Sequence, residues 1–187
     1  MMRKPGRRQA ERGFSLLEAM VVITLILIVS ALSVIGIQVA LRRSRAASAM
    51  QTVTLQLRRA RQAAIDERRL FFVTLEVPNR IRIQRRNPDT TLTQVGLFEL
   101  PITFQYCIEP GTPDTPDGFG LAAPVNFNGG NQLIFRPDGS AVDAIGRFAN
   151  GTAFVCRPGD ISLSSAVTIL GATGRIKGYR FEAGAFR

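Results

Sequence analysis

The N-terminal part of this chain places one carboxylate directly before a long uncharged stretch. Glu18 is followed by 19 residues, from Ala19 to Ile37, that contain no charged side chain. Such a stretch is about as long as a helix needs to cross the ~30 Å hydrocarbon core of a membrane. A carboxylate inside a bilayer costs roughly 2.5–3.5 kcal/mol even on the mildest scales. We therefore expect Glu18 to have a positively charged partner.

The C-terminal segment combines cations with aromatic rings. Arg175, Lys177 and Arg180 are interleaved with Tyr179 and Phe181. Cations contact phosphates and aromatic rings stack on bases, so this segment is a candidate DNA-binding site. The alternative, which we favour from the sequence, is a last β-strand with one face in water and the other packed on the protein.

The rest of the composition argues against catalysis. The chain has no histidine, which is the usual general base at neutral pH and the commonest metal ligand. It also lacks a glycine-rich phosphate loop and a serine nucleophile motif, so we predict no catalytic residue, no cofactor and no enzyme activity. Asp114 and Asp117 lie in a segment rich in proline and glycine. We expect both to be solvated turn residues, and we predict no metal site.

The net charge of +10 favours polyanions or anionic surfaces as partners. Residues 1–13 contribute +4 of this charge, so the rest of the chain carries +6.

The two cysteines, Cys107 and Cys156, cannot form a four-cysteine zinc site by themselves. An oxidising compartment would let them pair, and the closed loop would then stabilise the fold by about 4 kcal/mol. The alternative is a pair of buried thiols.

One long helix is expected to carry the N-terminal carboxylate. No proline occurs between Phe14 and Val77, and apolar residues beyond the uncharged stretch recur at helical spacing, namely at Ala46, Met50, Val53, Leu57, Ala60 and Ala64. We predict a helix over residues 14 to about 67. Its apolar stripe should be covered by the chain's own C-terminal part, and not by a coiled-coil partner. Arg58, Arg59 and Arg61 should form a solvated face.

From residue 70 onward the sequence shows the alternation typical of β-strands. A hairpin is expected around Pro78-Asn79, between an alternating run at Phe71–Val77 and a return strand through Ile81 and Ile83. Residues 109–131 contain four prolines and five glycines, which predicts a long surface loop. Further strands are expected at Thr103–Ile108, Gln132–Phe135, Thr152–Cys156, Ile161–Leu163, Ala166–Leu170 and Arg175–Phe181.

A helix followed by a sheet indicates the α+β class. We divide the chain into a leader (residues 1–13), an apolar half-helix (14–41), a soluble half-helix (42–68) and a β-rich globular domain (69–187).

The segment Gly13-Phe14-Ser15-Leu16-Leu17-Glu18 resembles the processing site of type IV pilins and type II secretion pseudopilins. The resemblance implies that a prepilin peptidase cleaves after Gly13 and methylates Phe14. It also implies that Glu18 pairs with the N-terminal amine of a neighbouring subunit. An ordinary signal peptide cleaved near Ala31-Leu32-Ser33 is the alternative. Glu18 and the apolar residues that continue past this site argue against it.

Later motifs resemble the FimT/GspH-type minor pilins and pseudopilins. They are Leu133–Ser140, the strand that contains Cys156, Val167-Thr168-Ile169 and Gly174-Arg175-Ile176-Lys177. The resemblance implies a β-rich domain packed on the second half of the helix. It also implies a structural subunit of a type IV pilus or a type II secretion pseudopilus.

The resemblance further implies a single-pass location in the bacterial inner membrane with the C-terminal domain in the periplasm. The implied partners are the prepilin peptidase, other pilin or pseudopilin subunits and membrane lipid. Some relatives with a Gly-Arg-x-Arg tail are associated with DNA capture. Gly174-Arg175-Ile176-Lys177 resembles that tail with lysine in place of the second arginine, so DNA is a further candidate partner.

Overall fold

The computed structural model describes residues 15–187, except for the side chains of residues 32–36 and 39. The predicted cleavage and methylation sites at Gly13 and Phe14 therefore lie outside the described residues. The chain divides into two compact units, Met1–Leu41 and Arg42–Arg187.

Helix α1 (Leu16–Glu67) begins in the first unit and ends in the second. No proline occurs between Phe14 and Val77, so the backbone hydrogen bonds of the helix continue without a break, because a proline would remove a backbone donor. The helix ends where Arg68 takes a φ of 52°, and Arg69 N donates a hydrogen bond to Ala64 O at 3.2 Å. This left-handed residue redirects the chain into the first strand. The predicted end of the helix is correct.

In the first unit, α1 exposes its apolar side chains. Every described side chain from Ser15 to Leu41 is exposed. Glu18 lies in the first turn, where the dipole of a helix favours a carboxylate. In the part of the chain that the structure describes, no helix combines the length and apolarity required to cross a membrane.

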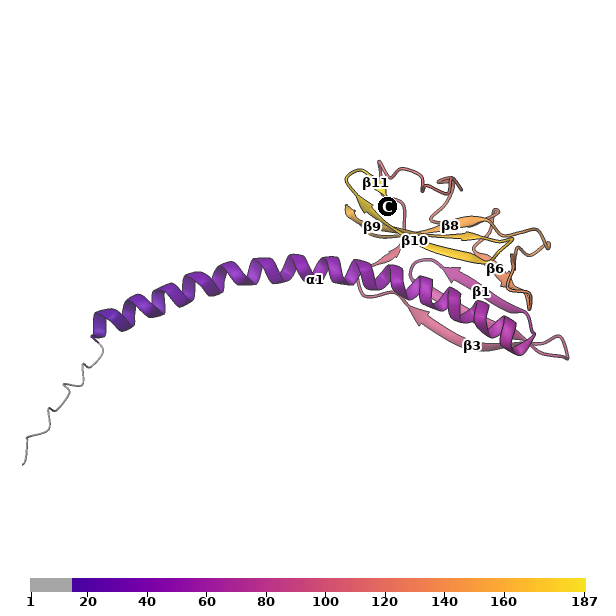
Figure 1. Ribbon diagram of the computed structural model, residues 1–187, viewed down its shortest axis with the longest axis horizontal. Helices are drawn as coiled ribbons and strands as arrows, with labels where there is room; N and C mark the ends of the chain where they lie inside the picture. Colours follow the sequence, from indigo (N-terminus) through magenta and orange to yellow (C-terminus); the bar gives the residue numbers. More distant parts are fainter. Residues whose placement is uncertain (1–14) are drawn as a thin grey trace, which may run out of the picture. The chain divides into compact units, whose positions relative to one another are not determined.

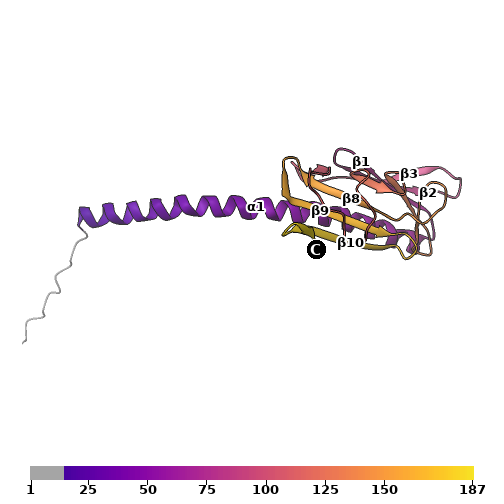
Figure 2. The ribbon, with the colours of Figure 1, turned by 90° about the horizontal axis from the view of Figure 1, so that it is seen from above.

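The second unit contains two antiparallel sheets (Figures 1 and 2). The first sheet has the order β3-β2-β1-β6-β7 and consists of β1 (Phe71–Glu76), β2 (Arg80–Arg86), β3 (Leu92–Glu99), β6 (Gln132–Phe135) and β7 (Ala141–Val142). The second sheet has the order β11-β10-β9-β8-β4 and consists of β4 (Gln105–Tyr106), β8 (Gly151–Arg157), β9 (Asp160–Leu170), β10 (Arg175–Glu182) and β11 (Ala185–Phe186). The short strand β5 (Val125–Phe127) also pairs with β8.

The main hydrophobic core lies between the second half of α1 and the two sheets. Its helix residues are Ala49, Val53, Leu57, Ala60 and Ala64, and each is at most 2% exposed. Val73, Phe135, Val167 and Ile176 are among the strand residues that complete it. The apolar stripe is thus covered by the chain's own sheets, as predicted, and the fold class α+β is confirmed.

The second unit carries its own core. All members of the two core clusters, including the partly buried residues packed on them, lie between Ala46 and Phe186. Burial of a valine or leucine side chain contributes about 1.5–3 kcal/mol, and none of this burial draws on residues 1–41. We therefore take residues 42–187 as a segment that folds independently.

The sequence missed four strands, namely β3, β5 and the two-residue strands β7 and β11, and it divided β9 into two. β3 is an edge strand with a bulge in its pairing to β2 and mostly exposed side chains, so it lacks the alternation that marks a half-buried strand. β5 lies inside the predicted loop 109–131, and its Val125 and Phe127 are buried. β9 runs unbroken through Ser164 and Ser165, two buried residues whose polarity suggested a break.

Candidate functional site

The assembly site predicted around Glu18 is described only from residue 15 onward. Glu18 is exposed in the first turn of α1, and it has no hydrogen bond or ion pair with any residue that the structure describes. In this turn Ala19 N donates a backbone hydrogen bond to Ser15 O at 3.1 Å. An exposed carboxylate at a helix N-terminus is accessible to a cation from another molecule.

The structure joins the two cysteines in a disulfide. Cys107 follows β4 and Cys156 lies in β8, and the pairing of these strands brings the two Cα atoms to 5.5 Å. Cys156 is 1% exposed. The bond attaches the start of the segment 109–131 to the second sheet. The sequence left open whether the two cysteines form a disulfide or remain buried thiols. The pairing of β4 with β8 brings them close enough for the disulfide.

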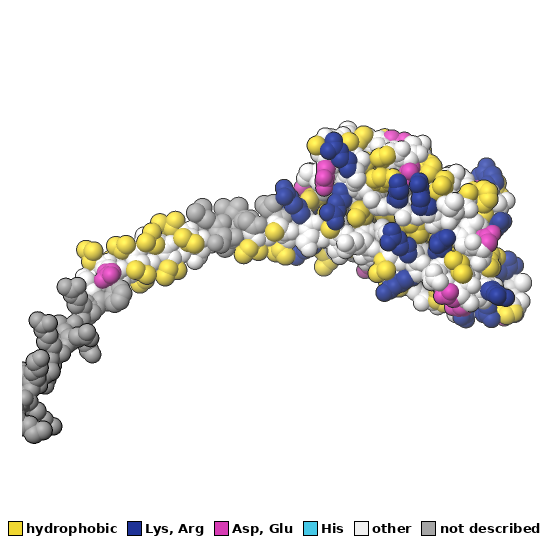
Figure 3. Space-filling model, in the orientation of Figure 1, with side chains coloured by type: hydrophobic (Ala, Val, Ile, Leu, Met, Phe, Trp, Pro, Cys, Tyr) yellow, Lys and Arg dark blue, Asp and Glu magenta, His cyan; other side chains and the backbone are white. Residues whose placement is uncertain are grey.

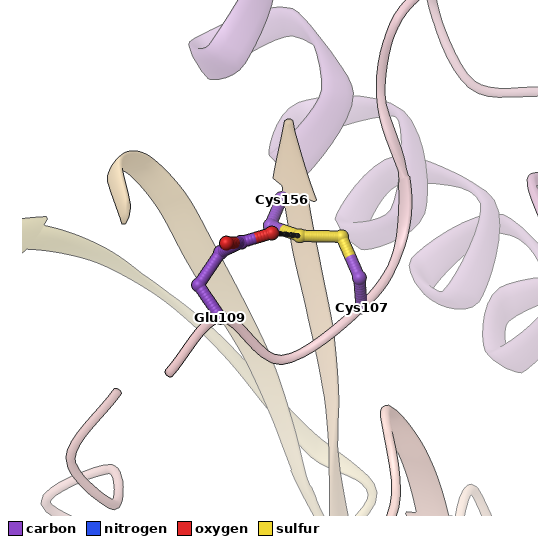
Figure 4. A group of neighbouring side chains, drawn as sticks. All are labelled: Cys107, Glu109 and Cys156. Atoms are coloured by element: carbon purple, nitrogen blue, oxygen red, sulfur yellow. Dashed lines mark hydrogen bonds between the residues drawn. A yellow bond between two sulfur atoms is a disulfide. The ribbon is translucent and has the colours of Figure 1, made fainter. Parts of the chain in front are cut away.

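Glu109 lies beside this disulfide (Figure 4). Its Oε1 accepts a hydrogen bond from Gly159 N at 3.1 Å and lies 3.5 Å from Cys156 Sγ. The two sulfurs and a carboxylate oxygen lie within 4.8 Å of one another, a spacing at which two thiolates and a carboxylate bind a metal ion. Thiolates are the metal-binding form of cysteine, and the disulfide removes both of them. Glu109 thus serves to hold the turn between β8 and β9.

Asp117 lies in a turn, as predicted, but the expectation that its side chain is solvated is wrong. Its carboxylate accepts hydrogen bonds from Thr168 Oγ1 at 2.6 Å, Tyr179 Oη at 3.0 Å and Arg175 Nη2 at 2.9 Å. The Asp117 side chain is only 13% exposed. Asp114 does form turn contacts, because it accepts from the backbone N–H groups of Thr115 and Gly120. The segment 109–131 is therefore bound to the second sheet through Asp117.

These contacts change the acidity of Asp117. Burial of the carboxylate acts to raise its pKa, but the hydrogen bonds from Thr168 and Tyr179 and the charges of Arg175 and Lys177 outweigh burial. The pKa of Asp117 is consequently below its ordinary value of 3.8. A carboxyl group whose pKa is lowered by folding stabilises the folded state while it is ionised.

Replacing Asp117 by asparagine is expected to lower the free energy of unfolding at neutral pH by about 1–2 kcal/mol, because a charged acceptor of three hydrogen bonds is lost. The wild-type advantage is complete above pH 3.8 and disappears as the pH falls through the lower folded-state pKa. Urea unfolding of residues 42–187 across this range measures the difference. Asp114→Asn, in the same segment, is the control and should cost less. An Asp117→Asn deficit that is independent of pH would contradict the assignment.

The structure divides the predicted DNA-binding cations between two faces of β10. Successive side chains of a strand point to opposite faces, so Arg175, Lys177 and Tyr179 share one face and Arg180 lies on the other. Arg175 forms an ion pair with Asp117, and Lys177 Nζ lies 5.8 Å from the centroid of the Tyr179 ring. The three cations therefore do not form one patch.

Arg61 has a different place from the solvated face that the sequence predicted. Its Nε donates to Gly139 O at 2.9 Å and its Nη2 donates to Thr173 O at 3.1 Å. Gly139 belongs to the turn between β6 and β7 in the first sheet, and Thr173 belongs to the turn between β9 and β10 in the second. Arg61 thus links α1 to both sheets. Arg58, Arg61 and Arg175 line an open hollow at these turns.

Comparison with known proteins identifies both the N-terminal motif and the fold. Residues 8–34 match the family model of the prokaryotic N-terminal methylation motif. The structure is similar to the type IV minor pilin FimU of Pseudomonas aeruginosa, with a TM-score of 0.52 and 14% identity over 78% of this chain and 94% of FimU. It is also similar to the minor pseudopilin EpsH from the type II secretion system of Vibrio cholerae, with a TM-score of 0.49 and 15% identity over 75% of this chain and 98% of EpsH. No curated protein matches the chain significantly by sequence.

The α1 helix packed on two antiparallel sheets is a pilin fold, as the similarity to FimU shows. The methylation motif includes the positions of Gly13, Phe14 and Glu18. The chain thus combines the N-terminal methylation motif with a pilin fold.

Proposed function

We propose that this chain is a minor pilin or pseudopilin, a structural subunit of a type IV pilus or a type II secretion pseudopilus with no catalytic role. The observation that carries the proposal is the methylation motif over residues 8–34 in a chain with the pilin fold. A prepilin peptidase removes residues 1–13 and methylates Phe14. The chain is held in the bacterial inner membrane by its apolar half-helix, with residues 42–187 in the periplasm, before it enters the filament.

The mechanism of assembly follows from burial of charge. When the apolar half of α1 leaves lipid for a bundle of related helices, Glu18 and the new amine of Phe14 are removed from water together. A buried charge without a partner is strongly unfavourable, whereas a pair in contact offsets much of its desolvation cost. The pairing of Glu18 on one subunit with Phe14 on its neighbour also determines the axial register of the two helices. Identical or related subunits are the partners in this step.

Glu18→Ala is expected to leave membrane insertion intact and to lower incorporation into filaments at least about tenfold, since a charged hydrogen bond is lost and an amine is left unpaired. Quantitative immunoblotting of sheared filaments and of the membrane fraction measures both quantities. Glu18→Gln keeps the size of the side chain and should fail as alanine does, while Glu18→Asp keeps the charge and should retain part of the function. Normal incorporation of Glu18→Gln would refute charge pairing.

Mass spectrometry tests the processing step separately. The mature chain should begin at a methylated Phe14. A chain that begins after Ser33, or one that retains Met1, would overturn the proposed function.

DNA capture through Arg175, Lys177 and Arg180 stays a prediction, and we do not propose it as the function. The separation of these cations on β10 and the ion pair between Arg175 and Asp117 favour the structural role.

A further inference from the structure

Five arginines of the second unit surround two adjacent hollows. One hollow is lined by Arg42, Arg45, Thr103, Phe104, Arg157 and Leu163, and the other by residues that include Arg43, Leu163 and Arg180. Leu163 lines both, so the hollows are neighbours on the surface. We name the five arginines, Arg42, Arg43, Arg45, Arg157 and Arg180, the basic collar. They come from the helix, from β8 and from β10, and only the fold brings them together.

The charges of the basic collar are not neutralised within the second unit. Among the described residues, none of the five side chains forms a hydrogen bond or an ion pair, in contrast to Arg61 and Arg175. Two acids lie nearby. Glu182 lines the second hollow, and Asp160 already accepts hydrogen bonds from the backbone and hydroxyl of Ser162. The excess of arginine leaves a positive surface that attracts anions.

The second unit as a whole is basic, but its charge is not confined to the collar. Residues 42–187 contain 19 basic and 12 acidic side chains. Figure 3 shows basic side chains spread over the visible face of this unit. Any test of the collar must therefore separate its effect from that of net charge.

An apolar side chain stands beside the collar. Pro101–Phe104 form a tight turn closed by a hydrogen bond from Phe104 N to Pro101 O at 3.0 Å. Ile102 occupies this turn and is 86% exposed, the largest exposure among the large apolar residues of the second unit. The next two residues, Thr103 and Phe104, line the same hollow as Arg42 and Arg45. The turn thus presents an isoleucine to solvent next to a group of unpaired arginines.

The position of the collar in the sequence indicates its partner. Arg42 follows directly on the apolar half-helix, and at 1.5 Å per residue the helix rises only about 5 Å from Arg42 to Arg45. If the preceding residues are anchored in a bilayer, as the proposed function requires, these arginines lie at the depth of the lipid headgroups. Guanidinium groups bind phosphate oxygens in bidentate geometry, and basic side chains near an anionic membrane strengthen binding several-fold each.

We propose that the basic collar binds the phosphodiester headgroups of anionic phospholipids, with Ile102 inserted among the acyl chains. This inference rests on the proposed function only for the membrane anchor. DNA offers the same phosphate chemistry, but a duplex provides no apolar medium for Ile102, so the bilayer is the better match. The contact holds the globular unit against the membrane until the subunit is taken into a filament.

Binding of residues 42–187 to vesicles tests the proposal without any filament. The segment is expected to sediment with vesicles of phosphatidylglycerol and phosphatidylcholine in equal parts, and not with phosphatidylcholine alone. The triple variant Arg42→Gln, Arg45→Gln, Arg157→Gln should bind about 100-fold more weakly. Ile102→Ser should weaken binding roughly tenfold, because burial of an isoleucine side chain is lost. Thermal unfolding establishes that each variant is folded.

The matched control removes the same charge elsewhere. Arg59→Gln, Arg68→Gln, Arg86→Gln alters three exposed arginines outside the collar and should bind anionic vesicles nearly as well as wild type. Equal losses in the two triple variants would overturn the proposal, because net charge alone would then explain binding. Collar-dependent binding to duplex DNA that exceeds binding to anionic vesicles at the same salt would also overturn it. Failure of Glu18→Ala to alter assembly would leave this vesicle result unaffected, so the two proposals are tested apart.

Discussion

Removal of the disulfide by Cys107→Ala and Cys156→Ala together is expected to lower the free energy of unfolding of residues 42–187 by about 4 kcal/mol. The two cysteines are 49 positions apart, and opening a loop of that size restores a large conformational entropy to the unfolded chain. A domain of this size is stabilised by only about 5–15 kcal/mol in total. We therefore expect the midpoint of thermal unfolding to fall by roughly 10 °C.

Urea unfolding of the oxidised wild type, the reduced wild type and the double variant distinguishes the cross-link from packing. Reduced wild type and the double variant should unfold at similar urea concentrations, both well below the oxidised protein. Cys156 is nearly fully buried, so a small further loss in the alanine variant reports the packing of its sulfur. If oxidised and reduced wild type unfold together, the disulfide does not stabilise the domain.

Gly174→Ala is expected to lower the free energy of unfolding by roughly 3 kcal/mol. Gly174 has a φ of 62°, a backbone conformation that residues with a side chain rarely adopt. A Cβ at this position would collide with Gly139 O and with Arg61 Nε. The collision would break the hydrogen bonds by which Arg61 links α1 to both sheets. Packing against Arg61 therefore explains why residue 174 is a glycine. The explanation requires no contact with DNA.

Gly159→Ala is the matched control for Gly174→Ala. Gly159 also has a positive φ, of 80°, but a Cβ there would meet no atom within 4 Å. It should therefore show only the cost of backbone strain, about 1–2 kcal/mol. Denaturant unfolding of both variants measures the difference, and Arg61→Ala should show no additional loss in the Gly174→Ala background. Equal destabilisation by the two glycine substitutions would exclude the close packing of Gly174 against Arg61.

Local patterns in the sequence were sufficient to predict helix α1 and the hairpin of β1 and β2. The uncharged run after Glu18, the absence of proline and the helical spacing of Val53, Leu57 and Ala60 predicted the helix and its buried face. The hairpin followed from the Pro78-Asn79 turn and from the alternation of residues on both sides of it. These features depend on residues within a few positions of one another, so their periodicity is visible in the chain.

Contacts between distant residues were decided only by the tertiary structure. Arg61 binds carbonyl oxygens 78 and 112 positions away, and Asp117 binds side chains 51 to 62 positions away. The basic collar likewise assembles arginines from three elements. From the sequence, Arg61 and Asp117 were assigned to solvent because charged residues are usually exposed. Their actual partners depend on how the two sheets pack on α1, and no local pattern in the chain carries that information.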